Sequence, residues 1–201
     1  EEQAESIAFV SVAFLLSLLL MFVLLVTQFN SFYQSLLILL AVIMSTAGVL
    51  IGLLVTDSAF SAILTGIGIV SLAGIVVNNN IVLIDTFNYV RQRHPELPLN
   101  SIIVRATAQR LRPVMLTTAT TVFGLLPLAL SMSVDLINRN INAGGQMALF
   151  WEPLSQAIVF GLSFAALLTL VATPALLALP SYIRARWQRE NDRNRTQVAL
   201  G

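Results

Sequence analysis

The chain has 201 residues, of which 57% are hydrophobic and only 10% are charged. The absence of cysteine excludes a disulfide framework and a thiolate metal site. The net charge of +1 conceals an uneven distribution, because long parts of the chain carry no charged residue. These uncharged stretches are residues 6–56, 58–84, 113–134 and 153–183. Each is long enough to cross a membrane, since a helix needs about 20 apolar residues to span the hydrocarbon core.

The first uncharged stretch is long enough for two crossings. It is divided by a polar and aromatic segment, residues 27–35, which is typical of a turn at the headgroup level of a membrane. We therefore predict an all-α fold, a polytopic membrane bundle with five transmembrane helices. The predicted helices lie near residues 7–27, 36–56, 60–88, 112–132 and 154–180.

The basic residues predict how the chain is oriented in the membrane. All eleven are arginine: five lie between the third and fourth spans, five follow the fifth span, and Arg139 alone lies between the fourth and fifth. Arginine-rich connections usually stay in the cytoplasm. We expect the N-terminus outside the cell membrane, a transmembrane domain at 1–183 and a basic cytoplasmic tail at 184–201. For this tail a solvated flank is favoured over binding to anionic headgroups or to nucleic acid.

The connections between spans differ in character. Residues 100–111 are expected to form a short amphipathic helix along the cytoplasmic interface, capped by Asn100 or Ser101. Its apolar side would consist of Ile102, Ile103, Ala106 and Leu111. The connection at 133–152 ends in Phe150 and Trp151 and is expected to be an exterior loop with an aromatic anchor.

Polar residues interrupt the third and fourth spans. Asn78 and Asp85 are seven residues apart in the third span and should share a helix face. Arg110, Thr117 and Gly124 repeat this spacing in the fourth. If the two faces meet, they form a chain of hydrogen-bonding groups running inward from the cytoplasm. The pattern leaves open an ion or transport pathway and simple hydrogen bonding between packed helices.

Small and polar residues in the spans favour close helix packing. The spacing of Gly48 and Gly52 is that of a small-residue packing motif. We assign packing roles to Gly48, Gly52, Gly74, Asn79, Asn80 and Gly124.

Enzyme chemistry is disfavoured by the few residues available for it. His94 is the only histidine and lies in a connection, and Asp85 is the only aspartate inside a span. A membrane serine protease needs a paired histidine, and an aspartyl protease needs two aspartates. We therefore predict no enzyme activity, no cofactor and no metal site.

Three segments carry a specific resemblance. They are Gly74-Ile-Val-Val-Asn-Asn-Asn-Ile-Val-Leu-Ile-Asp85, then Arg110-Leu-Arg-Pro-Val-Met-Leu-Thr-Thr-Ala-Thr-Thr, and Gly161-Leu-x-Phe-Ala-x-Leu-Leu-Thr-Leu-x-x-Thr-Pro-Ala-Leu. With Gly124-Leu-Leu-Pro-Leu-Ala-Leu130 between the last two, they resemble helices ten to twelve of resistance-nodulation-division (RND) efflux transporters. The resemblance covers helix eight to the cytoplasmic tail.

The resemblance implies a proton-driven antiporter of the bacterial inner membrane. Members are homotrimers that work with a periplasmic adaptor and an outer-membrane channel, and their substrate-binding domains lie in the periplasm. Each half of such a pump has one helix, a periplasmic domain and five more helices. Because Glu1 precedes the first span without a signal-peptide n-region, the chain is expected to be cut from such a pump, with its N-terminal half missing.

The resemblance also assigns roles to single residues. Arg110 matches the relay arginine and Thr117 the relay threonine, while Asn78 stands where many multidrug members have lysine. Asparagine carries no charge and can only donate and accept hydrogen bonds. Asp85 matches an acidic position at the cytoplasmic end of helix ten, and it is expected to act as an ion-pair partner, in packing or in the relay.

The function expected from these residues is a part of the proton relay of an efflux pump, incomplete by itself. Two alternatives remain. The chain is either a non-transporting membrane remnant or assembly scaffold, or a piece of a related proton-driven protein for protein or lipid export.

Overall fold

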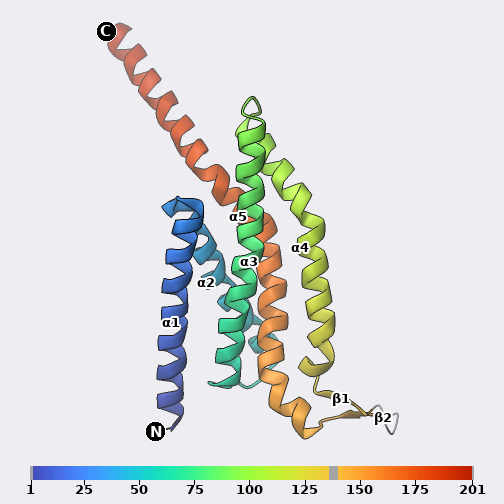
Figure 1. The fold of residues 1–201 in the computed structure, drawn as a ribbon. Helices are drawn as coiled ribbons and strands as arrows, with labels where there is room; N and C mark the ends of the chain where they lie inside the picture. Colours follow the sequence, from blue (N-terminus) through green and yellow to red (C-terminus); the bar gives the residue numbers. More distant parts are fainter. Residues whose placement is uncertain (1, 136–139, 201) are drawn as a thin grey trace.

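A computed structural model describes residues 2–135 and 140–200, with side chains described at 4–132, 144–180 and 182. Within these residues five helices pass back and forth through one bundle, and the two chain ends lie at its opposite ends (Figure 1). Each helix is long and apolar enough to cross a membrane. The predicted all-α membrane bundle is confirmed. The helices are α1 (Glu2–Phe29), α2 (Phe32–Val55), α3 (Leu64–Arg93), α4 (Leu99–Ala129) and α5 (Gln146–Leu200).

The turn between α1 and α2 is tight and lies within the segment predicted to be interfacial. Asn30 has a φ of 47°, in the left-handed region that asparagine tolerates better than most residues. Ser31 follows in an extended conformation and caps α2, because its side chain accepts a hydrogen bond from the main-chain N–H of Gln34.

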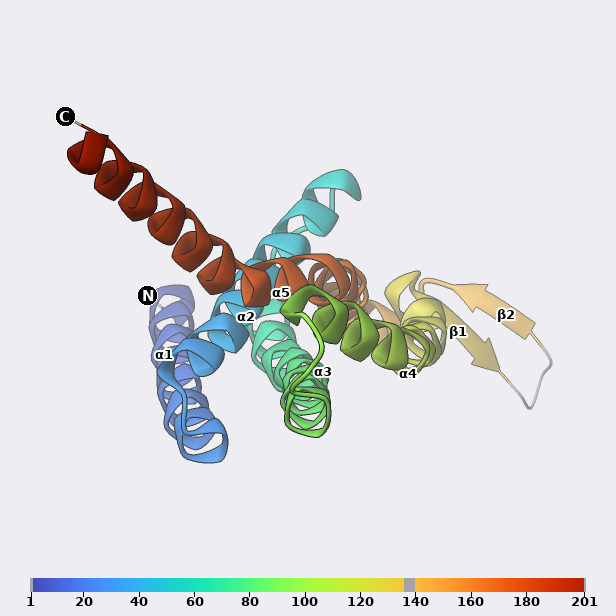
Figure 2. The ribbon, with the colours of Figure 1, turned by 90° about the horizontal axis from the view of Figure 1, so that it is seen from above.

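Helix α5 is the centre of the bundle. It packs against α2, α3 and α4, whereas α1 lies on the outside against α2 and α3 (Figure 2). Ile38, Leu72 and Leu162, from α2, α3 and α5, are almost completely buried. Because lipid tails are as apolar as these side chains, close packing rather than escape from water holds the helices together.

Helix α4 differs from the prediction. A separate interfacial helix at 100–111 was expected before a span at 112–132, but one helix runs from 99 to 129 through Pro113. Its first turns pack on the bundle, because Ile102, Ile103 and Ala106 are buried in the same core cluster as residues of α3. Proline removes only one helical hydrogen bond, and this packing holds the helix together across the gap.

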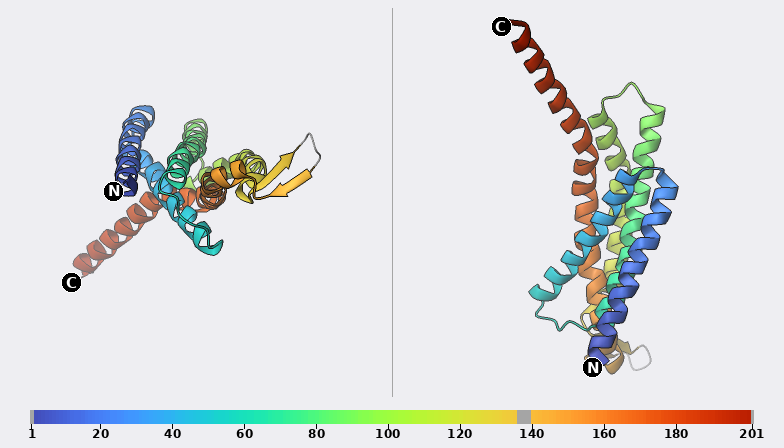
Figure 3. Two further views of the ribbon diagram at one scale, coloured as in Figure 1. Left: turned by 90° about the horizontal axis from the view of Figure 1, so that it is seen from below. Right: turned by 90° about the vertical axis from the view of Figure 1, so that its left-hand side faces the viewer.

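The end of α5 and the connection before it also differ from the expectation. The connection contains a short antiparallel ribbon of β1 (Met132–Asp135) and β2 (Asn140–Ala143), which was not predicted. Helix α5 continues beyond the bundle through the basic tail as far as Leu200 (Figure 3). Arg139 lies outside the described residues, as do the tail side chains.

Candidate functional site

Arg110 is held at the contact between α3 and α4. Its Nε donates a hydrogen bond of 2.5 Å to Oγ1 of Thr86 on α3. The Arg110 side chain is half-buried, and Thr86 is only 5% exposed. The resemblance gave Arg110 a place in a relay with Asn78 and Thr117, but its hydrogen bond in the described structure is to Thr86, a residue that was not singled out from the sequence.

Asn78 and Asp85 lie on the outer side of α3. Both are exposed, whereas Val76, Asn80 and Ile84 on the other side are buried in the bundle. Their spacing of seven residues places them nearly one above the other. An uncharged amide and a carboxylate therefore lie on a side of α3 that its neighbouring helices leave exposed.

Thr117 stands seven residues after Arg110 in α4, a spacing that returns to nearly the same side of a helix. Thr117 is exposed, and its hydroxyl donates to main-chain carbonyl oxygens of its own helix, at Pro113 and Val114, each 3.1 Å away. Asn78, Arg110 and Thr117 thus lie on adjoining, partly open sides of two neighbouring helices.

Asn80 differs from its two neighbours in sequence. It is completely buried, and its Nδ2 donates to Val76 O at 2.9 Å and to Thr169 Oγ1 at 3.2 Å. Its Oδ1 accepts from Thr173 Oγ1 at 2.9 Å. This network ties α3 to α5 and satisfies the buried amide, whereas Asn79 is half-buried.

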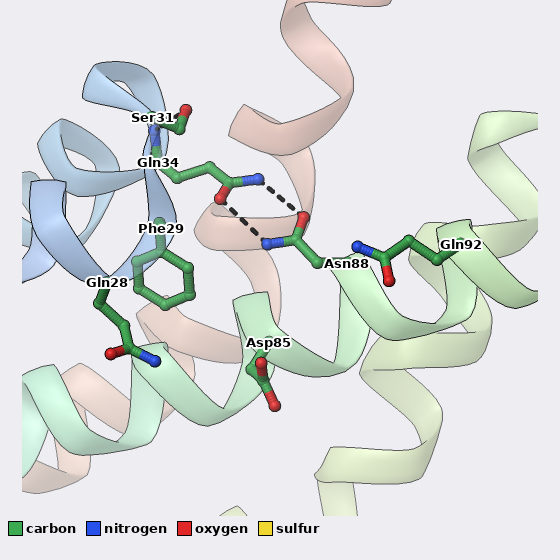
Figure 4. Close-up of a pocket in the computed structure, with 7 residues that line it drawn as sticks. All are labelled: Gln28, Phe29, Ser31, Gln34, Asp85, Asn88 and Gln92. Carbon is green, nitrogen blue, oxygen red and sulfur yellow. Dashed lines mark hydrogen bonds between the residues drawn. The ribbon is translucent and has the colours of Figure 1, made fainter.

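Asp85 lines a polar hollow of about 380 Å³ beside the turn between α1 and α2 (Figure 4). Gln34 and Asn88, two of the residues that line it, exchange two amide hydrogen bonds, of 2.9 and 3.1 Å. In the described part of the chain no arginine forms an ion pair with Asp85. The hollow is lined by Gln28, Phe29, Ser31, Gln34, Asp85, Asn88 and Gln92.

The glycines assigned to packing fall into two groups. A Cβ at Gly48 would lie 2.4 Å from Phe164 Cβ, and one at Gly52 would lie 2.2 Å from Phe160 Cγ. These two glycines therefore let α2 approach α5 closely. Nothing in the described structure lies within 4 Å of a Cβ at Gly74 or Gly124. Those two glycines belong to the same open sides of α3 and α4 as Asn78 and Thr117.

Other polar contacts of the bundle were not anticipated. Glu152 accepts hydrogen bonds from Ser131 and from Gln156, which also reaches the carbonyl oxygen of Ala129 at 3.2 Å. The contacts of Ser131 with Glu152 and of Gln156 with Ala129 join residues more than 20 positions apart, and single-helix spacing does not predict them.

Comparison with known proteins places this arrangement in a family. The model of the AcrB/AcrD/AcrF family matches residues 1–181. The multidrug resistance protein MdtC of Proteus mirabilis (strain HI4320) is 34% identical over 175 residues, which is 87% of this chain and 16% of that protein. MdtC of Escherichia coli (strain UTI89 / UPEC) is 35% identical over 162 residues, 81% of this chain and 14% of that protein.

Solved structures agree with the sequence relatives. Two crystal forms of a heavy metal efflux pump match this chain with TM-scores of 0.63 and 0.67, both at 32% identity. They cover 81% and 86% of this chain, which in turn spans 14% and 15% of the pump. The family match over almost the whole chain and these relatives lead to one conclusion: the chain belongs to the AcrB/AcrD/AcrF family of RND efflux transporters.

Proposed function

We propose that this chain is the C-terminal membrane portion of a proton-driven drug efflux antiporter, and that it supplies part of a proton relay completed by another segment of the full transporter. The relay residues are Asn78, Arg110 and Thr117, with Asp85 as an ion-pair or relay partner. The proposed setting is the bacterial inner membrane, with the N-terminus in the periplasm and the C-terminus in the cytoplasm. The full transporter would be a homotrimer working with a periplasmic adaptor and an outer-membrane channel.

The observation that carries the proposal is the exposed polar side of α3 and α4. Asn78 and Thr117 are exposed in helices long enough to span a membrane. An amide facing hydrocarbon without a partner costs several kcal/mol, so such a side chain persists only where protein or water covers it. The open side, which also contains Gly74 and Gly124, therefore suits the docking of another membrane segment.

The chemistry of these groups decides what they contribute. The guanidinium of Arg110 keeps its proton throughout, and Asn78 and Thr117 do not ionise, so none of the three carries a proton through a transport cycle. Arg110 can instead stabilise a carboxylate of the docking segment, and this stabilisation is lost when that carboxylate takes up a proton. The relatives are a multidrug resistance protein and a heavy metal efflux pump, which supports transport as the function.

The test is made in a full-length transporter that contains this chain. We expect Arg110→Ala and Thr117→Ala each to lower proton-coupled efflux by about tenfold or more, because a hydrogen bond to a charged group contributes about 1.5–3 kcal/mol. Thr46→Ala is the control, because the hydroxyl of Thr46, like that of Thr117, bonds to a carbonyl oxygen of its own helix, at 2.7 Å. Normal efflux in both relay variants would contradict the assignment.

Asn78→Leu separates the proposal from a non-transporting scaffold. If the polar side only packs helices, the substitution changes the association of the membrane segments and leaves proton flux unchanged. If Asn78 belongs to the relay, proton flux falls while the transporter remains assembled. Proton flux is measured in reconstituted vesicles with a pH-sensitive dye, and assembly by size-exclusion chromatography.

A further inference from the structure

The hydroxyl of Thr86 donates one hydrogen bond and accepts another. Its Oγ1 donates to the carbonyl oxygen of Val82, one turn earlier in α3, at 2.8 Å. The same oxygen accepts from Nε of Arg110 on α4 at 2.5 Å. Thr86 is 5% exposed, so water has little access to compete for either bond.

The first bond determines what the second can be. A threonine hydroxyl has a single hydrogen, and here the carbonyl oxygen of Val82 takes it. The oxygen of Thr86 can then only accept, which suits a donor with a permanent positive charge. Donation to Val82 also polarises the hydroxyl and makes its oxygen a better acceptor.

Arg110 is bound at one end of its guanidinium only. The group has five N–H donors in a fixed plane, and Thr86 uses the one on Nε, next to the aliphatic stem. Among the described residues no acceptor is bound to the two terminal nitrogens. A bond at Nε restricts the rotation of the side chain, and the other four N–H groups stay available for a second acceptor.

We propose that Thr86 is the positioning residue of Arg110: it holds the guanidinium through Nε and so presents the terminal N–H groups to an acceptor outside this chain. The inference rests on the proposed function only in one respect, that an acceptor outside this chain binds the terminal N–H groups. The anchoring itself depends on the described contact alone.

Two substitutions at position 86 separate positioning from helix packing. Thr86→Val keeps the shape of the side chain and removes the acceptor oxygen. Thr86→Ser keeps the oxygen and removes a methyl group. If the hydrogen bond matters, serine behaves as the wild type and valine does not; if only packing matters, the order is reversed. Thr107→Val is the matched control, because Thr107 bonds to a carbonyl oxygen of its own helix, at 2.9 Å.

The first experiment measures anchoring without reference to transport. The chain is labelled with ¹⁵N-arginine, placed in lipid nanodiscs, and the Nε–H signal of Arg110 is assigned by its loss in Arg110→Lys. We expect its exchange with water to be about tenfold faster in Thr86→Val, as loss of a hydrogen bond to a charged group implies, and unchanged in Thr86→Ser and Thr107→Val. Unchanged exchange in Thr86→Val, or faster exchange in Thr86→Ser, would overturn the inference.

The second experiment measures proton-coupled efflux by the full-length transporter. We expect about a tenfold loss in Thr86→Val and wild-type efflux in Thr86→Ser. If Arg110→Ala is impaired and Thr86→Val is not, the positioning role is wrong and the proposed function stands. If Arg110→Ala is unimpaired, the proposed function is wrong, and the exchange measurement still decides whether Thr86 anchors Arg110.

Discussion

The hydroxyl of Tyr33 on α2 donates a hydrogen bond of 2.5 Å to the main-chain carbonyl oxygen of Leu176 on α5. In a regular helix that oxygen would accept from the N–H of residue 180, but residue 180 is proline and has no N–H. A side chain from another helix thus satisfies a carbonyl group that the proline leaves without its usual partner. This bond joins the start of α2 to the part of α5 where it leaves the bundle.

Tyr33→Phe should lower the free energy of unfolding by about 1 kcal/mol, because it leaves the carbonyl oxygen of Leu176 without a donor. The effect should shrink in a Pro180→Ala background, where the N–H of the new alanine can bond to that oxygen. The double-mutant cycle is measured by reversible unfolding in mixed detergent micelles. Equal losses in both backgrounds would show that the proline and the tyrosine are independent.

Asn80→Leu should destabilise the bundle more than Asn79→Leu. Asn80 is completely buried and bonded to Thr169 and Thr173, so leucine leaves two threonine hydroxyls without their partner. Hydrogen bonds between membrane helices contribute about 0.6–2 kcal/mol, and a loss of this size is expected for Asn80. Asn79 is half-buried and serves as the adjacent control with the same chemical change. A larger loss at Asn79, measured by the same unfolding assay, would refute this role of Asn80.

The sequence was most informative where a pattern repeats along one helix. Charge-free stretches predicted five spans, and the seven-residue spacing placed Asn78 with Asp85 and Arg110 with Thr117 on shared sides. Composition could not show that 100–111 continues into the fourth span, because this depends on packing against α3.

Contacts between helices were the part that sequence could not supply. Three consecutive asparagines have the same chemistry, yet only Asn80 lies towards α5, since a helix turns by about 100° per residue. The pairing of Arg110 with Thr86 likewise depends on how two helices are rotated against each other. The relay assignment of Asn78, Arg110 and Thr117 stays a prediction, to be decided by transport assays.

Glu96, in the connection between α3 and α4, should titrate below the usual range of a glutamate. A hydrogen bond from its own main-chain N–H is the main cause of its lowered pKa, and the side chain of His94, 3.1 Å away, is the second. Because the folded-state pKa lies below the unfolded one, the stabilisation is present above the unfolded pKa and is lost as pH falls through the folded pKa. In an NMR titration, His94→Ala should raise the pKa of Glu96 only in part, and an unchanged titration would contradict the contact.

Replacing the four packing glycines by alanine should separate them into two groups. In Gly48→Ala and Gly52→Ala the new methyl group meets Phe164 or Phe160, so each should lose about 1–3 kcal/mol of unfolding free energy by overpacking. In Gly74→Ala and Gly124→Ala the methyl group meets nothing within 4 Å in the described structure, and a gain of up to about 1 kcal/mol from helix propensity is expected.

The variants Gly74→Ala and Gly124→Ala also test whether another membrane segment covers the open side of α3 and α4. If a membrane segment docks there, Gly74→Ala and Gly124→Ala destabilise the full-length transporter while the 201-residue chain tolerates them. Thermal unfolding of both proteins in the same detergent provides the comparison, with Gly52→Ala as the variant that must be destabilising in each. Equal tolerance in the two proteins would mean that the side stays open to lipid, and Asn78 would then face hydrocarbon without the partner that its amide requires.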